Sequence, residues 1–153
     1  MILDGRVLLP WPAAPGNGAT IILATTHPKV PTGGTATIQP SSVLVSTDNY
    51  LNALEFVWLR NDQASAANGV RVYALDDTGT FREVDVKNYL NAATIGSAAP
   101  FQVPILSAGQ EYHLLIDVSR YRGVAVEYTA GATGPTNWNG TIFAHLSVEA
   151  LQR

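Results

Sequence analysis

The sequence predicts an all-β protein, an antiparallel β-sandwich with no long helix. Apolar and polar residues alternate along three segments near the C-terminus, at residues 112–118, 124–128 and 141–148. Side chains of a strand point alternately to opposite faces, so this period of two places the apolar ones on a single buried face. Turn-forming residues recur about every 8–12 residues, a spacing that is typical of sandwiches and barrels.

The N-terminal segment, residues 1–15, is predicted to be an extended, proline-rich arm. Three prolines lie between residues 10 and 15, and proline has no backbone N–H to offer a helix or a central strand. The first predicted strand follows at residues 20–25. A sandwich over residues 20–149 then makes the 153 residues a single domain.

The middle of the chain supplies the remaining strands. Leu54, Phe56 and Trp58 share one face of residues 51–60, and the opposite face is also apolar, which is typical of a central strand or of an interface. Pro104 confines a strand at residues 101–105 to an edge or a bulge. The other predicted elements are weaker strands at 35–38 and 43–46, a polar loop at 61–69, a hairpin of 70–75 and 81–86 with its turn at 76–79, a short helical turn at 87–92, and an exposed loop at 131–140.

These segments add up to eight or nine strands, and eight strands favour a jelly roll. The alternation within each strand also predicts the core, because a register slip of one residue would expose every apolar side chain of that strand. The residues predicted to lie between the two sheets are Leu54, Phe56, Leu114, Ile116, Val126, Ile142 and Leu146.

Composition and charge argue against two classes of partner. The net charge is −3 and the basic residues are scattered, so no basic run is present to follow a nucleic-acid backbone. No apolar stretch approaches the roughly 20 residues that span a bilayer. The short apolar run near the N-terminus lacks the features of a signal peptide. We therefore expect a chain made without a secretory signal that binds neither nucleic acid nor membrane.

The low charge has two interpretations. Charged residues make up 14% of the chain, whereas about 25% is typical of soluble domains. One interpretation is an ordinary sandwich whose outer faces are rich in threonine and serine. The other is a surface largely covered by partner subunits, because the centres of interfaces are depleted in charge.

The residues that carry chemistry form no recognisable catalytic pattern. The chain has no cysteine, and its three histidines belong to no metal-binding motif. No Gly-x-Ser-x-Gly sequence is present to indicate a serine nucleophile. We expect a protein that is not an enzyme and that holds no metal or cofactor.

Two tryptophans are the best candidates for contacts with a partner. Trp58 is predicted to be part of the core, whereas Trp11 and Trp138 lie in predicted loops, where aromatic side chains often anchor interfaces. A stacking platform for a sugar is the alternative role for these two residues. The predicted interface set is Trp11, Pro12, Pro15, Asn137 and Trp138.

The stretch from Asp117 to Val124, Asp-Val-Ser-Arg-Tyr-Arg-Gly-Val, is the most distinctive local motif. Together with the Gly/Thr-rich loop and closing strand that follow, it resembles the C-terminal hairpin of jelly-roll structural proteins of tailed bacteriophages, in particular capsid decoration (cement) proteins. The resemblance covers about residues 100–153. The proline-rich N-terminal segment, the absence of cysteine and the Ala/Thr-rich surface are similar to that group as well.

The resemblance implies a virion protein on the capsid surface, made in the host cytoplasm. It implies binding to the major capsid protein and to copies of itself, commonly as a homotrimer. The same Asp-x-Ser-x-Tyr turn also looks like turns of carbohydrate-binding sandwiches. A carbohydrate-binding or receptor-binding module, whose partner would be a glycan, is therefore the alternative. A tail or head–tail connector component is a second alternative.

Overall fold

The computed structural model describes residues 4–25, 51–75, 81–84, 102–117 and 123–147. Within these ranges the chain forms eight strands and no helix. The strands are β1 (Asp4–Leu9), β2 (Thr20–Thr25), β3 (Leu51–Asn61), β4 (Ser65–Leu75), β5 (Phe81–Val84), β6 (Tyr112–Asp117), β7 (Val124–Ala130) and β8 (Trp138–Ser147).

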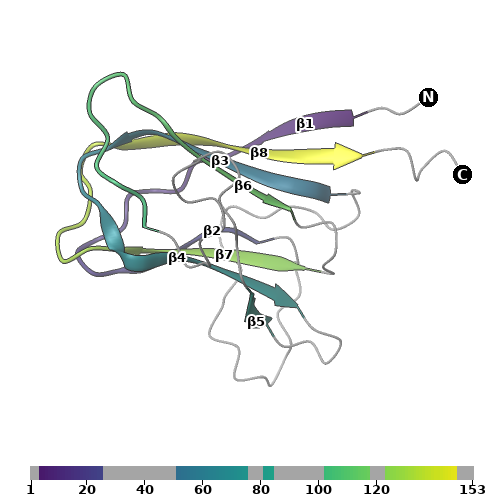
Figure 1. Ribbon diagram of the computed structural model, residues 1–153, viewed down its shortest axis with the longest axis horizontal. Coiled ribbons are helices and arrows are strands. Elements are labelled where there is room, and N and C mark those ends of the chain that lie inside the picture. The colour runs from purple at the N-terminus through teal and green to yellow at the C-terminus, as the bar shows by residue number, and fades with distance from the viewer. Residues whose placement is uncertain (1–3, 26–50, 76–80, 85–101, 118–122, 148–153) are drawn as a thin grey trace, which may run out of the picture.

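The strands form two antiparallel sheets of four strands each. The first sheet has the order β1-β8-β3-β6, and the second has the order β2-β7-β4-β5. Figure 1 shows the two sheets as stacked layers, with the first sheet above the second. The predicted all-β class and the pair of antiparallel sheets are therefore confirmed.

Side chains from the inner faces of both sheets make up one core. Of the seven residues predicted there, six are at most 4% exposed, and the side chain of Leu146 lies outside the described residues. The core also contains Trp58 and Tyr128, both fully buried. Since burying one large apolar side chain contributes about 1.5–3 kcal/mol, the alternation seen in the sequence corresponds to the main source of stability.

The prediction that residues 51–60 form a central strand or an interface strand is also confirmed. β3 lies between β8 and β6 and pairs with both. Its inner face carries Leu54, Phe56 and Trp58. On the outer face Val57 is still only 6% exposed, which explains why this segment is apolar on both sides.

The N-terminal segment differs from the extended arm expected over residues 1–15. Residues 4–9 form the edge strand β1, which pairs with β8 from Asp4 opposite Ser147 to Leu9 opposite Ile142. The physical reason is that the prolines begin only at residue 10, so the preceding residues keep the N–H groups that an edge strand donates. The irregular connection between the sheets therefore begins at Pro10.

The polar loop expected at residues 61–69 is shorter than predicted, because β4 already begins at Ser65. The pairing of β4 with β7 shifts register between Ser65 and Val70, which marks a bulge. Asn68 adopts a φ of 59° within it, a conformation that asparagine tolerates better than most residues. Next to it, a Cβ on Gly69 would lie 2.7 Å from two backbone oxygens, so a glycine is required there.

The prediction of a strand at residues 101–105 is wrong for residues 102–105, the part that the structure describes. These residues form no strand. Four hydrogen bonds tie the segment to the β3–β4 corner instead, one of them donated by Gln102 Nε2 to the carbonyl of Ser65 at 3.0 Å. Ser65 donates its N–H to the carbonyl of Val103 (3.0 Å), and its Oγ accepts from the Val103 N–H (2.9 Å). Asn61 Nδ2 donates to the carbonyl of Pro104 (3.0 Å). Because Pro104 has no N–H to donate, one backbone bond and several side-chain bonds replace regular strand pairing here.

Several predicted elements lie outside the described residues. These are the weaker strands at 35–38 and 43–46, the hairpin turn at 76–79, the helical turn at 87–92, and the centre of the distinctive motif at 118–122.

Candidate interaction surfaces

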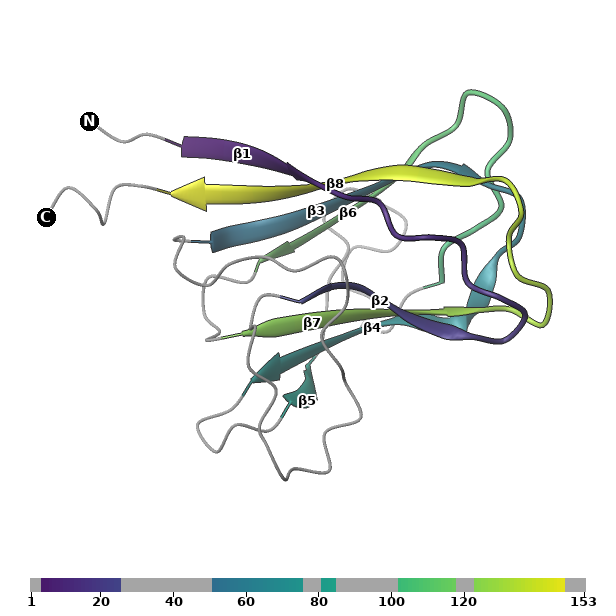
Figure 2. The ribbon, with the colours of Figure 1, turned by 180° about the vertical axis from the view of Figure 1, so that it is seen from behind.

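Four connections gather at one end of the sandwich, which we call the loop end. They are residues 10–19, 62–64, 102–111 and 131–137, seen at the left of Figure 1 and at the right of Figure 2. Backbone bonds join some of them to one another, for example from the Gly18 N–H to the carbonyl of Gly131 at 2.8 Å. The loop end is therefore a cross-linked surface rather than a set of independent loops.

A cluster of aromatic rings lies beneath the loop end. The ring of Trp11 meets the buried ring of Trp58 edge-on at 5.5 Å and lies 5.2 Å from that of Trp138. Trp138 in turn meets Tyr128 edge-on at 5.0 Å. The indole N–H of Trp138 donates to the carbonyl of Pro12 at 2.9 Å, which fastens the β1–β2 connection to the start of β8.

The loop position predicted for Trp138 is wrong, whereas that predicted for Trp11 is confirmed. Trp138 is the first residue of β8 and pairs with Asn61 of β3. Trp11 does lie in a connection, but its side chain and that of Trp138 are partly buried against the core of their own chain. Contact of these two residues with a partner stays a prediction.

The other predicted interface residues have different surroundings. Pro12 is partly buried and Pro15 is buried, and the backbone of Pro15 lies so close to Gly134 that a Cβ there would collide with it. Asn137 is exposed beside Trp138. The structure thus brings the predicted set together at the loop end, although Pro15 presents little surface to a partner.

A pocket lies at the loop end beside Asn137. Its volume is about 310 Å³, and its walls come from the end of β3, from residues 106–109 and from the β7–β8 connection. The lining residues are Leu59, Arg60, Asn61, Leu106, Ser107, Ala108, Gly109 and Asn137. Among the described residues Arg60 makes no ion pair. Except for Asn137, sequence reasoning missed this site, because its walls are distant along the chain.

The pKa values of two side chains at the loop end, Tyr128 and Asp62, are shifted by their surroundings. Burial raises the pKa of Tyr128 to about 12, and the side chain of Asn61 opposes this shift. The side-chain hydrogen bond from Thr136 lowers the pKa of Asp62, with further bonds from backbone amides. The first effect keeps Tyr128 neutral over a wide pH range, and the second keeps Asp62 ionised.

The outer face of the first sheet combines apolar and charged side chains. One row across this sheet contains Leu8, Phe143, Glu55 and Leu115. Leu8 is 63% exposed, whereas Phe143 and Leu115 are partly buried. Arg6 lies over the Phe143 ring, 4.3 Å from its centre. This row forms an apolar strip that runs across the sheet and contains one carboxylate.

The carboxylate of that strip faces a histidine. Glu55 Oε2 and His145 Nε2 are 3.6 Å apart, both atoms are buried, and neither has a hydrogen-bond partner. Nearby, His113 Nε2 lies 2.8 Å from Glu111 Oε2 in a more exposed position. The outer face of the first sheet therefore contains two His–Glu pairs.

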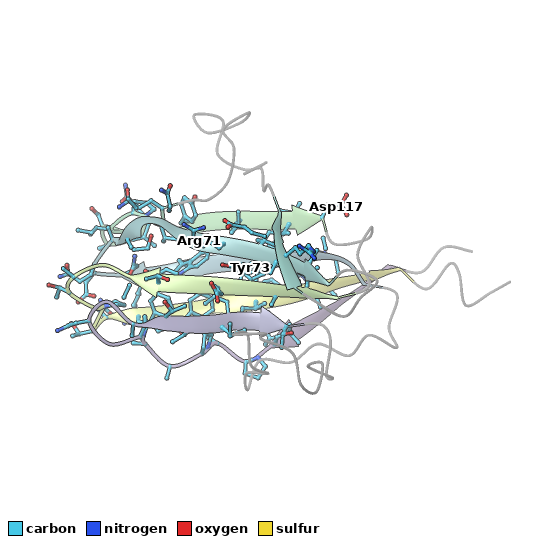
Figure 3. The ribbon with its side chains drawn as sticks, turned by 90° about the horizontal axis from the view of Figure 1, so that it is seen from below. Arg71, Tyr73 and Asp117 are labelled. Carbon is cyan, nitrogen blue, oxygen red and sulfur yellow. The ribbon has the colours of Figure 1, made fainter. Side chains whose placement is uncertain are left out.

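The outer face of the second sheet carries a smaller polar group, seen from outside in Figure 3, where Arg71 and Tyr73 are labelled. The Arg71 guanidinium donates to both oxygens of Glu83 at 2.8 Å. Burial raises the pKa of Glu127, opposed by a hydrogen bond from Tyr73 and by the charge of Arg71. Burial and the adjacent Glu127 also raise the pKa of Tyr73. These pairs link side chains of β4 to β5 and to β7, which the backbone ladders already join.

Among the described residues, no group of three or more His, Asp or Glu side chains is arranged to hold a metal ion. The same part of the chain contains no helix with the length and apolar character needed to cross a membrane. Comparison of the chain with protein-family models, with curated proteins and with solved structures found no match.

Proposed function

We propose that this chain is a non-enzymatic structural protein of a virion, which attaches to the outside of a phage capsid and helps to hold capsid subunits together. The observation that carries the proposal is the order of the strands. β1 pairs with β8, β2 with β7, β3 with β6, and β4 with β5. Pairing of the first half of the chain with the second half in reverse order supports a jelly roll, a fold that viral capsid domains use.

The proposed partners are the major capsid protein and further copies of the chain, assembled as a homotrimer. The low content of charged residues, 14%, supports a surface that subunits cover. A trimer attaches through three copies of each contact, so weak individual contacts combine into strong binding. The chain thus needs no single deep binding site to remain on a particle.

The outer face of the first sheet is the proposed attachment surface. Leu8, partly buried Phe143 and Leu115 offer an apolar strip at its centre. The neighbouring row contains Arg6, His145, Ala53 and Asp117, and its Arg6 and Asp117 supply charges of both signs beside the strip. An apolar centre with a polar rim is the usual anatomy of a protein interface. The tryptophans of the loop end contribute indirectly, because they stabilise the sandwich.

The test is a binding experiment with the purified full chain and with empty capsids of its own virus. We expect light scattering to give the mass of a trimer, and sedimentation to show the chain bound to capsids. Leu8→Asp places a charge in the apolar strip and should abolish co-sedimentation while the far-UV spectrum remains unchanged. Ile105→Asp is the matched control, because Ile105 is 57% exposed but lies at the loop end, and this variant should bind normally.

Three results would contradict the proposal or its attachment surface. If the wild-type chain fails to bind capsids at micromolar concentration, the chain is not a decoration protein. Antibody labelling that places the chain on tails or at the portal would show the connector or tail role instead. Equal loss of binding in both variants would reject the outer face of the first sheet as the attachment surface.

A further inference from the structure

The pocket at the loop end has the features of a ligand site that the structural role does not use. Its volume of about 310 Å³ lies at the lower end of the range of roughly 300–1,000 Å³ found for small-molecule sites. One sugar ring is a ligand of suitable size for such a pocket, whereas an oligosaccharide would extend into solvent.

The walls of this pocket are held in place before any ligand arrives. The Leu106 N–H donates to the carbonyl of Asn61 at 2.8 Å, which joins residues 106–109 to the end of β3. Ser107 and Gln110 close the turn with two bonds of 3.0 Å each. A preorganised wall loses little conformational entropy on binding, which favours affinity.

The third wall is fixed in the same way. Both carboxylate oxygens of Asp62 accept hydrogen bonds from Thr136, at 2.9 Å from its backbone N–H and at 2.7 Å from its hydroxyl. These bonds position the residue that follows, Asn137. On its other side the indole bond of Trp138 fixes the first residue of β8. Asn137 is therefore presented from a rigid segment.

Most of the lining side chains that can bind a ligand are hydrogen-bond donors that have no partner among the described residues. Among the described residues, the side chains of Arg60, Ser107 and Asn137 form no hydrogen bond or ion pair within the protein. Arg60 is the charged residue of the lining, so the pocket favours a negative group. Leu59 and Leu106 add apolar surface beside these donors.

We propose that this pocket binds a single acidic sugar residue, with the sugar carboxylate on Arg60 and the hydroxyls on Asn137 and Ser107. A guanidinium pairs with a carboxylate through two parallel hydrogen bonds, which gives both strength and orientation. The C–H face of the sugar ring then lies on Leu59 and Leu106. This proposal is independent of the virion role, since the pocket is at the loop end and the attachment surface is on the outer face of the first sheet.

The experiment uses the full chain labelled with ¹⁵N and titrated with glucuronate at pH 7. We expect saturable shifts of the amide signals of Ser107, Ala108 and Gly109. Glucose is the matched control ligand, because it differs from glucuronate only in carrying a neutral hydroxymethyl group in place of the carboxylate, and it should bind at least about ten-fold more weakly. Acetate supplies the carboxylate without the ring and should also bind at least ten-fold more weakly.

Two variants test the residues. Arg60→Gln should weaken glucuronate binding by about ten-fold or more, because it removes the charged donor. Arg71→Gln is the control of equal charge change, since Arg71 lies on the outer face of the second sheet in an ion pair with Glu83, and its affinity for glucuronate should equal that of the wild type. Asn137→Ala should lower the affinity for glucuronate without changing the response to acetate.

Four outcomes would overturn the proposal. They are the absence of saturable shifts with glucuronate, equal affinity for glucose and glucuronate, equal affinity for acetate and glucuronate, and unchanged glucuronate binding by Arg60→Gln. The third outcome would show a simple carboxylate site that does not recognise the sugar. None of these outcomes bears on capsid attachment, which a separate experiment measures.

Discussion

Replacement of Trp11 by alanine tests whether the N-terminal segment belongs to the fold or serves as an arm for a partner. The side chain packs against Trp58 and Trp138, with ring centres 5.5 Å and 5.2 Å away. Each aromatic pair contributes about 0.5–1.5 kcal/mol beyond simple burial. Removal of roughly 100 Å² of buried apolar surface costs about 2.5 kcal/mol. Because partial relaxation recovers some of this, we expect a loss of about 3 kcal/mol in the free energy of unfolding.

The assay is urea denaturation of the isolated full chain, followed by far-UV circular dichroism because the substitution removes a fluorophore. For a domain of about 150 residues the expected loss corresponds to a fall of roughly 6–12 °C in Tm. Trp11→Phe should keep part of the ring contacts, so its free energy of unfolding should lie between those of the wild type and Trp11→Ala. Ile105→Ala, at a position that is 57% exposed, should change the free energy of unfolding by less than about 0.5 kcal/mol.

If both the midpoint and the slope of the denaturation curve are unchanged in Trp11→Ala, this reasoning is refuted. Such a result would show that the ring adds nothing to the fold of the free chain, as expected for a residue reserved for a neighbouring subunit. In that case the variant should instead lose attachment to capsids. A change in the slope of the denaturation curve without a change in its midpoint would point to the unfolded state.

Two further predictions follow from the packing beneath the loop end. Gly140→Ala should lower the free energy of unfolding by about 1–3 kcal/mol, measured by urea denaturation. The added Cβ would collide with the Val57 carbonyl and lie 2.7 Å from the Trp11 ring. A variant as stable as the wild type would contradict this packing. Since the pKa of Tyr128 is about 12 in the folded chain and 10.0 in its reference state, its contribution to stability is complete below pH 10 and is lost as the pH rises toward 12. Tyr128→Phe should lack this alkaline decline in Tm, and an identical decline in both proteins would reject the assignment.

The pattern of the sequence predicted the core because burial of a strand face follows from local alternation. Leu114 and Ile116 of β6 and Val126 of β7 could be assigned to the inner faces without knowing which strands pair. The same pattern predicted that β3 is central, since a strand buried on both faces needs apolar residues in both parities. Proline and glycine also indicated the described turns near Gly18 and Gly109.

Three features could not be obtained in that way because they depend on pairing between distant segments. β1 is a strand because β8 lies beside it, although the nearby prolines resemble an arm. Trp138 belongs to β8 because it pairs with Asn61. The start of β4 at Ser65 depends on its pairing with Ala130 and on a bulge that local composition does not indicate.

The sequence by itself determined the all-β class, the two faces of each regular strand and the low surface charge, because each is a property of composition or of short-range periodicity. The tertiary structure decided the partners of each strand, the packing of Trp11 and Trp138 against their own chain, and the pocket around Arg60. The walls of this pocket, at residues 59–61, 106–109 and 137, are more than 25 residues apart in the chain. They meet because hydrogen bonds such as that from Leu106 to Asn61 close long loops, and no local pattern encodes a contact of that kind.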